Sequence, residues 1–317
     1  MAKFDFIKRS CELSSSEKNV KFKDPKHDLE ISTGRFFYYW NDEKYQSGNL
    51  YATDNVELSH GKVIHLLANQ AYLDSDVETI LLDHPIGTIT SSLFKSSQKR
   101  ELNFTSERLH WDQKEKTLKL QENAEVEEES FGTLFAKDSL LIEQGEKKDS
   151  FYIKSIKTVG ESFFTRRDGL NLSCDGSIYF NPETMELVAD QKNRPLEFHY
   201  SDLVIQAERA SLSYFDEKPS KITFTNQVKL FNEEVIGKAD TLTYDLVGHK
   251  ITLEGDEVLF WDQSEHLHMA AEKLEIEHHE ESHKNRVKGI GKVRFEIDEN
   301  EKNNLLTILE SCMKNLF

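Results

Sequence analysis

The 317-residue sequence has little proline or glycine and no long hydrophobic run. Five prolines and fourteen glycines, with no low-complexity stretch, argue against broad disorder. The first residues lack the apolar stretch of about 7 to 15 residues that a signal peptide contains. The sequence also contains no run of about 18 apolar residues, the length that a helix needs to cross a bilayer. We therefore expect neither a signal peptide nor a membrane-spanning helix in this sequence.

Cysteines and basic residues are also scarce. Cys11, Cys174 and Cys312 lie too far apart for a zinc pair, a redox CxxC or a disulfide framework. Lysine and arginine number 40 against 57 acidic residues, which gives a formal net charge of −17. Such a surface repels the phosphates of nucleic acids, so we expect no nucleic-acid partner.

Recognisable catalytic motifs are missing, with one formal exception. The sequence contains no GxSxG, GxxxxGKS, GxGxxG or paired CxxC pattern. The string HEESH at 279–283 matches HExxH, but its surroundings lack the apolar side that holds a zinc-binding helix on a core. His266 and His268 could bind a metal together with a third ligand, although such alternation is more typical of exposed strand surface. We expect no enzyme, bound metal or cofactor.

What the sequence does contain is a degenerate repeat. Seven stretches open with a small residue, continue with polar and alternating apolar residues, and follow one another at spacings of 30 to 38 residues. They begin at Ala68, Ser106, Ala136, Cys174, Ala207, Ala239 and Ala271. A period of this size indicates stacked supersecondary units, each of which covers the apolar face of its neighbour.

Within a copy, apolar residues alternate with polar ones, as in Leu242 and Tyr244 or Ile251 and Leu253. Turn sequences such as YDLVGHK and LEGDEV separate these runs roughly every ten residues, with no helical pattern between them. The pattern predicts an all-β fold, an elongated β-jellyroll or solenoid-like stack of short antiparallel strands.

Three segments follow from these patterns. Residues 1–40 are predicted to be a mobile N-terminal leader, because they are rich in Lys, Ser and Asp and lack clear periodicity. Residues 41–300 hold the repeats. Residues 301–317 show apolar residues at helical spacing, which predicts a short C-terminal helix that caps the array or binds a partner.

The best copies, ADTLTYDLVGHKITLEGDEVLF, AERASLSYFDEKPSKITFTNQVKLF and AEKLEIEHHEESHKNRVKGIGKVRF, resemble the repeat of the OstA-like family, the LptA-type β-jellyroll proteins of lipopolysaccharide transport. The resemblance covers about residues 48 to 297. It implies a periplasmic, non-enzymatic protein that carries lipopolysaccharide or a related glycolipid to the outer membrane in an apolar trough. It also implies that other transport components, or further copies of the chain, join through end-on β-strand addition.

The inward apolar residues of the last copies are the candidate lipid-binding wall of such a trough. They are Leu212, Tyr214, Ile222, Phe224, Val228, Leu230, Leu242, Tyr244, Ile251, Leu253, Val258, Phe260, Leu274, Ile276, Val287, Val293 and Phe295. The same alternation fits a closed core filled by its own side chains. Two other functions stay open: a scaffold that binds protein partners, and a β-helix polysaccharide hydrolase, whose carboxylates cannot be singled out among 57 acidic residues.

Overall fold

The structure is a computed structural model that describes residues 2–5, 8–15, 19–25, 27–40, 48–91, 100–147, 150–263, 266–279 and 284–297. In these ranges the chain consists of β-strands joined by turns and short connections, and it contains no helix. The all-β prediction is confirmed. The helix predicted at 301–317 lies outside the described residues.

The chain divides into two compact units, Met1–Arg167 with Cys174–Leu187, and Asp168–Ser173 with Val188–Phe317. The strands wholly in unit 1 are β1 (Ala2–Asp5), β2 (Ser10–Ser14), β3 (Val20–Asp24), β4 (Leu29–Thr33), β5 (Arg35–Trp40), β6 (Gly48–His60), β7 (Ile64–Asp74), β8 (Thr79–Asp83), β9 (Ile86–Ser91), β10 (Arg100–Thr105), β11 (Arg108–Asp112), β12 (Thr117–Gln121), β13 (Ala124–Glu128), β14 (Gly132–Ala136), β15 (Ser139–Lys147), β16 (Ser150–Val159), β17 (Ser162–Thr165) and β19 (Ser177–Asn181). The strands wholly or mostly in unit 2 are β18 (Asn171–Cys174), β20 (Glu186–Asp190), β21 (Leu196–Tyr200), β22 (Leu203–Ala207), β23 (Arg209–Phe215), β24 (Lys218–Phe231), β25 (Val235–Asp245), β26 (Lys250–Asp262), β27 (Leu267–His279), β28 (Lys284–Ile290) and β29 (Arg294–Ile297).

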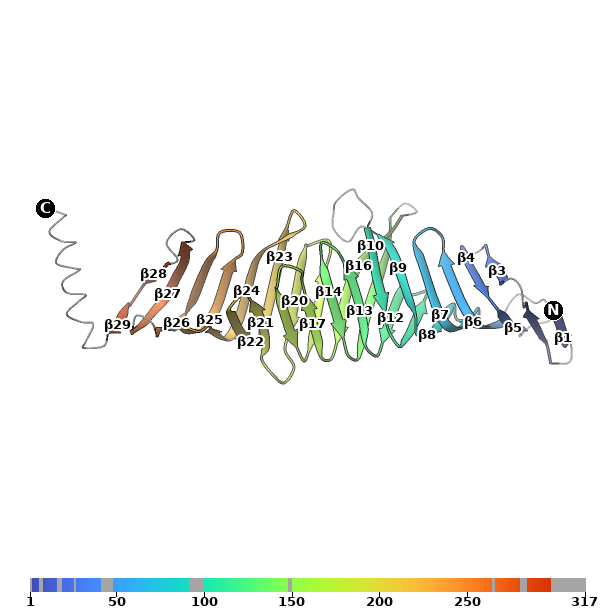
Figure 1. The fold of residues 1–317 in the computed structure, drawn as a ribbon, viewed down its shortest axis with the longest axis horizontal. Helices are drawn as coiled ribbons and strands as arrows, with labels where there is room; N and C mark the ends of the chain where they lie inside the picture. The colour runs from blue at the N-terminus through green and yellow to red at the C-terminus, as the bar shows by residue number, and fades with distance from the viewer. Residues whose placement is uncertain are drawn as a thin grey trace. The chain divides into compact units, whose positions relative to one another are not determined.

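Unit 1 is built from two antiparallel sheets whose strands follow one another side by side (Figure 1). Sheet A1 contains, in spatial order, β1, β2, β5, the first half of β6, the second half of β7, β8, β11, β12, β15, β16 and β19. Sheet B1 contains β3, β4, the second half of β6, the first half of β7, β9, β10, β13, β14 and β17.

Unit 2 repeats this plan. Sheet A2 runs through β23, β24, β25, β26, β27 and β28, and sheet B2 runs through β18, β21, β22, β24, β25, β26, β27 and β29. The strands from β24 to β27 therefore contribute one half to each sheet. Their registers shift between the halves, as at Thr225 and Val228, where Asn226 and Gln227 take positive φ. Such a bulge bends the strand so that it can pass from one sheet to the other.

The small residues that open the sequence copies lie where the chain passes from a B sheet to an A sheet. Ala68, Ser106, Ala136, Cys174, Ala207, Ala239 and Ala271 are all buried. Ala239, for example, lies at the register shift of β25, between the half that pairs in B2 and the half that pairs in A2. At a buried position where the chain leaves one sheet for the other, a small side chain avoids overpacking.

The core lies between the facing sheets of each unit. In unit 1, His60 on sheet B1 contacts Trp111 on sheet A1, with ring centroids 5.2 Å apart. In unit 2, Phe198 on sheet B2 lies 5.2 Å from Phe224 on sheet A2. Inward apolar side chains alternate with outward polar ones along each strand, as the sequence pattern predicts.

Residues 1–40 differ from the mobile leader that the sequence predicts. Residues 2–40 include five strands, and Leu29, Ile31, Phe36 and Trp40 are buried. These strands are short, and their outward positions carry many lysines and acidic residues. The composition of the segment therefore obscured its alternation, although β4 and β5 follow the same inward and outward pattern as the later copies.

Candidate functional site

The structure places the predicted wall residues of the A2 sheet in two inward rows. Cross-strand pairing aligns Leu212, Ile222, Tyr244, Ile251, Ile276 and Val287 in one row, and Phe224, Leu242, Leu253 and Leu274 in the other. On the B2 sheet, Leu230, Phe260 and Phe295 share a third inward row. The sequence therefore identified which side chains point between the sheets.

Most of these residues are fully buried. Ile222, Phe224, Val228, Leu242, Leu253, Val258 and Leu274 have no exposed surface, and Leu212, Tyr214, Leu230, Phe260 and Ile276 are at most 8 % exposed. Tyr244, Ile251 and Val287 are half-buried. This part of unit 2 is filled by its own side chains, so no open trough runs along it.

Exposure rises at the β28–β29 side of unit 2. Val293 is 43 % exposed and Phe295 is 63 % exposed, although Phe295 continues the inward row of Phe260. Within the described residues no further strand pairs beyond β29 in sheet B2. The last inward side chains of a stack lose their cover in this way unless another element closes them off.

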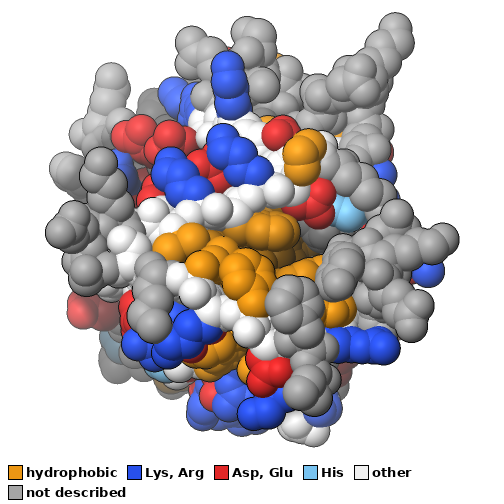
Figure 2. Space-filling model, turned by 90° about the vertical axis from the view of Figure 1, so that its right-hand side faces the viewer, with side chains coloured by type: hydrophobic (Ala, Val, Ile, Leu, Met, Phe, Trp, Pro, Cys, Tyr) orange, Lys and Arg blue, Asp and Glu red, His pale blue; other side chains and the backbone are white. Residues whose placement is uncertain are grey.

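A second opening lies at the β1–β5 end of unit 1, and we call it the end hollow. It is a cavity of about 370 Å³ lined by Phe4, Cys11, Leu13, Lys21, Phe22, Phe36, Tyr38, Trp40 and Leu50. Figure 2 views this end and shows apolar side chains gathered in a depression with charged side chains around it. The cavity falls within the size range of small-molecule sites, which are concave and mostly apolar.

The end hollow is formed by side chains from both sheets of unit 1. Phe4, Cys11, Tyr38 and Leu50 are cross-strand neighbours on sheet A1. Phe22 on β3 of sheet B1 faces Phe36 on sheet A1, with ring centroids 6.2 Å apart. β1 and β3 are the outermost described strands of their sheets at this end. Phe4 is 61 % exposed, and Phe22 and Tyr38 are half-buried. Phe36 and Leu50 are buried.

The charges near the end hollow are paired at its rim. The ammonium groups of Lys21 and Lys23 lie 3.2 Å and 2.7 Å from the carboxylate oxygens of Glu30. The hydrogen bonds that they donate, first of all the one from Lys23, lower the pKa of the Glu30 carboxyl. Burial raises the pKa of the Cys11 thiol, which keeps it neutral inside the hollow. The site therefore offers apolar contact surface with a neutral interior, and it suits an aliphatic ligand.

The end hollow was missed at the sequence level. Its lining residues all belong to the first 50 positions, most of which the sequence predicts as leader. The available signal was the alternation through Phe22, Ile31, Phe36, Tyr38 and Trp40, which the Lys-rich background obscured.

The candidate metal sites gain no support. No group of three or more His, Cys, Asp or Glu side chains comes together in the part of the chain that the structure describes. His266 is exposed, and His268 stacks on Trp261 with ring centroids 5.1 Å apart. Residues 280–283 of the HExxH string lie outside the described residues. The described residues include no helix of the length and apolarity needed to cross a membrane.

Each unit is a β-roll of two facing sheets with an apolar interior. In unit 1 this interior opens at the β1–β5 end. Comparison with known proteins adds no family: no protein-family model matches the chain, and no curated protein sequence matches it at a significant level. The resemblance to the OstA-like family therefore rests on the repeat residues and stays a prediction.

Proposed function

We propose that this protein is a non-enzymatic periplasmic carrier or bridge for lipopolysaccharide or a related glycolipid, and that it holds acyl chains between its facing sheets. The observation that supports the proposal is the end hollow, where the inter-sheet interior is open and almost entirely apolar. Burial of each methylene group is worth about 0.8 kcal/mol, so an acyl chain gains affinity in such a site without any chemical step.

The end hollow is where acyl chains would enter. The buried wall residues of unit 2, such as Phe224 and Leu253, already fill the space between their sheets. A chain could reach them only if the sheets moved apart and their mutual packing was replaced by contacts with lipid. Among the predicted wall residues, Val293 and Phe295 have the largest exposed fractions.

Partners of the proposed carrier would bind at the ends of the sheets. Strands β1, β3, β28 and β29 are outermost among the described strands, and such edges offer unpaired backbone groups to an added strand. The same edges favour the second candidate function, a scaffold that binds proteins and carries no lipid. The two functions differ in whether the interior contacts acyl chains.

A photo-crosslinking experiment separates them. Tyr38 lines the end hollow, whereas its neighbour Tyr39 on β5 points outward and is 47 % exposed. A photoreactive phenylalanine derivative at position 38 is expected to label lipopolysaccharide in producing cells, and the same group at position 39 is expected not to. Equal labelling at both positions, or none at position 38, would reject the carrier in favour of the scaffold.

A further inference from the structure

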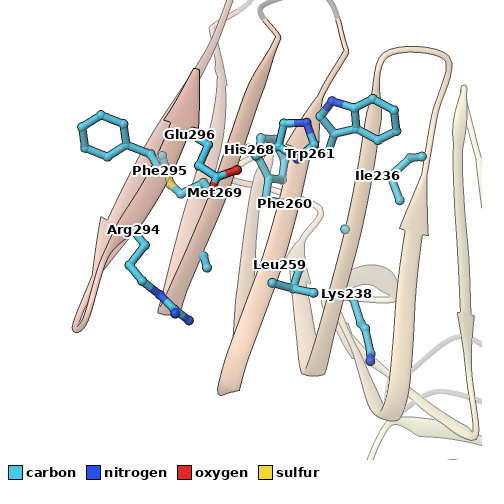
Figure 3. Close-up of a pocket in the computed structure, with 12 residues that line it drawn as sticks. Ile236, Lys238, Leu259, Phe260, Trp261, His268, Met269, Arg294, Phe295 and Glu296 are labelled. Carbon is cyan, nitrogen blue, oxygen red and sulfur yellow. The ribbon is translucent and has the colours of Figure 1, made fainter. Parts of the chain in front are cut away.

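A second hollow lies on the outer surface of unit 2, on the face of sheet B2 that points away from the core. We call it the outer hollow. It has a volume of about 430 Å³ and involves strands β25, β26, β27 and β29 (Figure 3). Its outward side chains form two cross-strand rows. One row is Ile236, Trp261, His268 and Glu296, and the other is Lys238, Leu259, Ala270 and Arg294.

The shape of the outer hollow follows from this grid. Ala270 is small and lies between Leu259 and Arg294, so the floor is low at this point. Trp261 and His268 stand beside it in the other row. By strand alternation Lys238, Trp261 and Arg294 share the outward face, whereas Phe295 continues the inward row of Phe260; Figure 3 labels these residues. The hollow is therefore separate from the space between the sheets.

Trp261 gives the outer hollow an exposed aromatic surface. It is 38 % exposed, and its neighbour Leu259 is 42 % exposed, whereas Trp40 and Trp111 are buried. The ring of His268 stacks on the indole at an interplanar angle of 27°, which restricts its rotation. A restrained, solvent-facing indole beside an exposed leucine is typical of a binding surface, because burying it on ligand binding costs little conformational entropy.

The charges of the outer hollow are uneven. Lys238 lies directly across from Lys229 on β24, and both are exposed. Within the described part of the chain neither lysine makes an ion pair, whereas Arg294 pairs with Glu257. Like charges opposite each other on neighbouring strands destabilise a sheet. The chain as a whole is acidic, with a net charge of −17, so two neighbouring lysines without a carboxylate partner form a local positive site. An anionic ligand would neutralise it.

We propose that the outer hollow binds an anionic saccharide, with a sugar ring on Trp261 and Leu259 and its acidic group at Lys238 and Lys229. A pyranose presents a C–H face that suits the negative face of an indole. Lys238 and Trp261 are diagonal cross-strand neighbours, about 7 to 8 Å apart, so one sugar with a phosphate or carboxylate substituent reaches both. Glu296 lies on β29, about 14 Å from the strand of Lys238, too far to oppose this anion strongly.

The inference rests on the proposed function in one respect: a glycolipid headgroup is the saccharide that the protein would meet. Its test needs no acyl chain. The probe is the phosphorylated oligosaccharide released by complete deacylation of lipopolysaccharide, titrated into the full chain by calorimetry. Neutral dextran oligosaccharide and inorganic phosphate are titrated alongside, so that binding of the sugar ring alone and binding of phosphate alone are measured.

The variants are Trp261→Ala and Lys238→Ala. The matched controls are Tyr179→Ala and Lys157→Ala, which change a cross-strand pair on the outer face of unit 1. We expect the deacylated saccharide to bind at least tenfold more weakly to each outer-hollow variant, and within twofold of wild type to the controls. Dextran and inorganic phosphate are each expected to bind at least tenfold more weakly than the phosphorylated saccharide.

Two results would overturn the inference. One is no saccharide binding by the folded wild-type chain. The other is wild-type affinity in the Trp261→Ala variant, which would reduce the surface to an anion site without sugar recognition. Either result leaves acyl-chain binding in the end hollow untouched, because that site lies in unit 1 and is probed at Tyr38.

Discussion

The interior of unit 2 around Phe224 and the end hollow of unit 1 are made from the same pattern and have different properties. Both consist of alternating apolar side chains on facing sheets. Around Phe224, strands on either side cover its row, and Ala210, Leu242 and Leu253 are buried with it. At the end hollow, β1 and β3 are outermost among the described strands, and about 370 Å³ stays open.

The comparison shows that position in the stack decides whether an apolar wall becomes core or binding surface. Each unit of a stack relies on its neighbours to cover its apolar face. Where a neighbour is present the wall packs at crystal-like density. Where none is present, the wall offers burial to a ligand or to another chain. Mutations can therefore test the two regions against each other.

The largest difference is expected on removing a large side chain from the filled interior. Phe224→Ala deletes a completely buried ring that packs on Phe198, and we expect it to lower the free energy of unfolding by about 3 to 5 kcal/mol. Phe215→Ala, at a position that is 78 % exposed, is the control and should cost less than about 0.5 kcal/mol. Urea denaturation measures both. Similar losses for the two variants would mean that the interior of unit 2 is not packed as described.

Added volume should also distinguish the regions. Ala210 lies in the filled interior, cross-strand from Phe224, and Ala210→Phe is expected to cost about 1 to 3 kcal/mol through overpacking. Cys11→Phe places the new ring in the end hollow, which has space for it, so the free energy of unfolding should stay close to that of wild type. If Cys11→Phe destabilised the protein as much as Ala210→Phe, the hollow would not be open.

The same Cys11→Phe variant should impair ligand binding. Filling the end hollow removes apolar surface that acyl chains would occupy, and we expect the Kd for an acylated glycolipid to rise at least tenfold, about 1.4 kcal/mol. Tyr39→Phe, an outward change on the same end of unit 1, should leave the Kd unchanged. Fluorescence titration with a labelled glycolipid measures both. An unaltered Kd in Cys11→Phe would place the lipid elsewhere.

A small pH effect is expected from the outer face of sheet A2, where neither interior is involved. The hydrogen bond from Lys250, together with the other lysines around it, lowers the pKa of Glu275 in the folded state. The resulting stability is present above the ordinary glutamate pKa of about 4.3, and it is lost as the pH falls from there through the folded-state value. The thermal midpoint should therefore fall less steeply with acidification in Glu275→Gln than in wild type. Parallel pH profiles would show that this network does not contribute.

Much of the fold could be predicted because its signals are local. Alternation identifies which side chains face inward, and small residues such as Ala239 mark where each copy begins. The first 40 residues were misread because their strands are short and their outward faces rich in lysine. Whether a wall is filled depends on strands far away in sequence. The outer hollow depends on them too, because Lys238 and Arg294 belong to one row only through the pairing of β25, β26, β27 and β29. Alternation carries no information about either.

Quenching of tryptophan fluorescence by a glycolipid with brominated acyl chains tests the central claim most directly. Trp40 lines the end hollow, Trp111 is buried in unit 1 and Trp261 lies on the outer face of unit 2. We predict that the brominated lipid quenches the wild-type protein and the Trp261→Phe variant, and that quenching disappears in Trp40→Phe. Quenching that persists in a folded Trp40→Phe variant, or that never occurs in the wild type, would contradict acyl-chain binding in the end hollow.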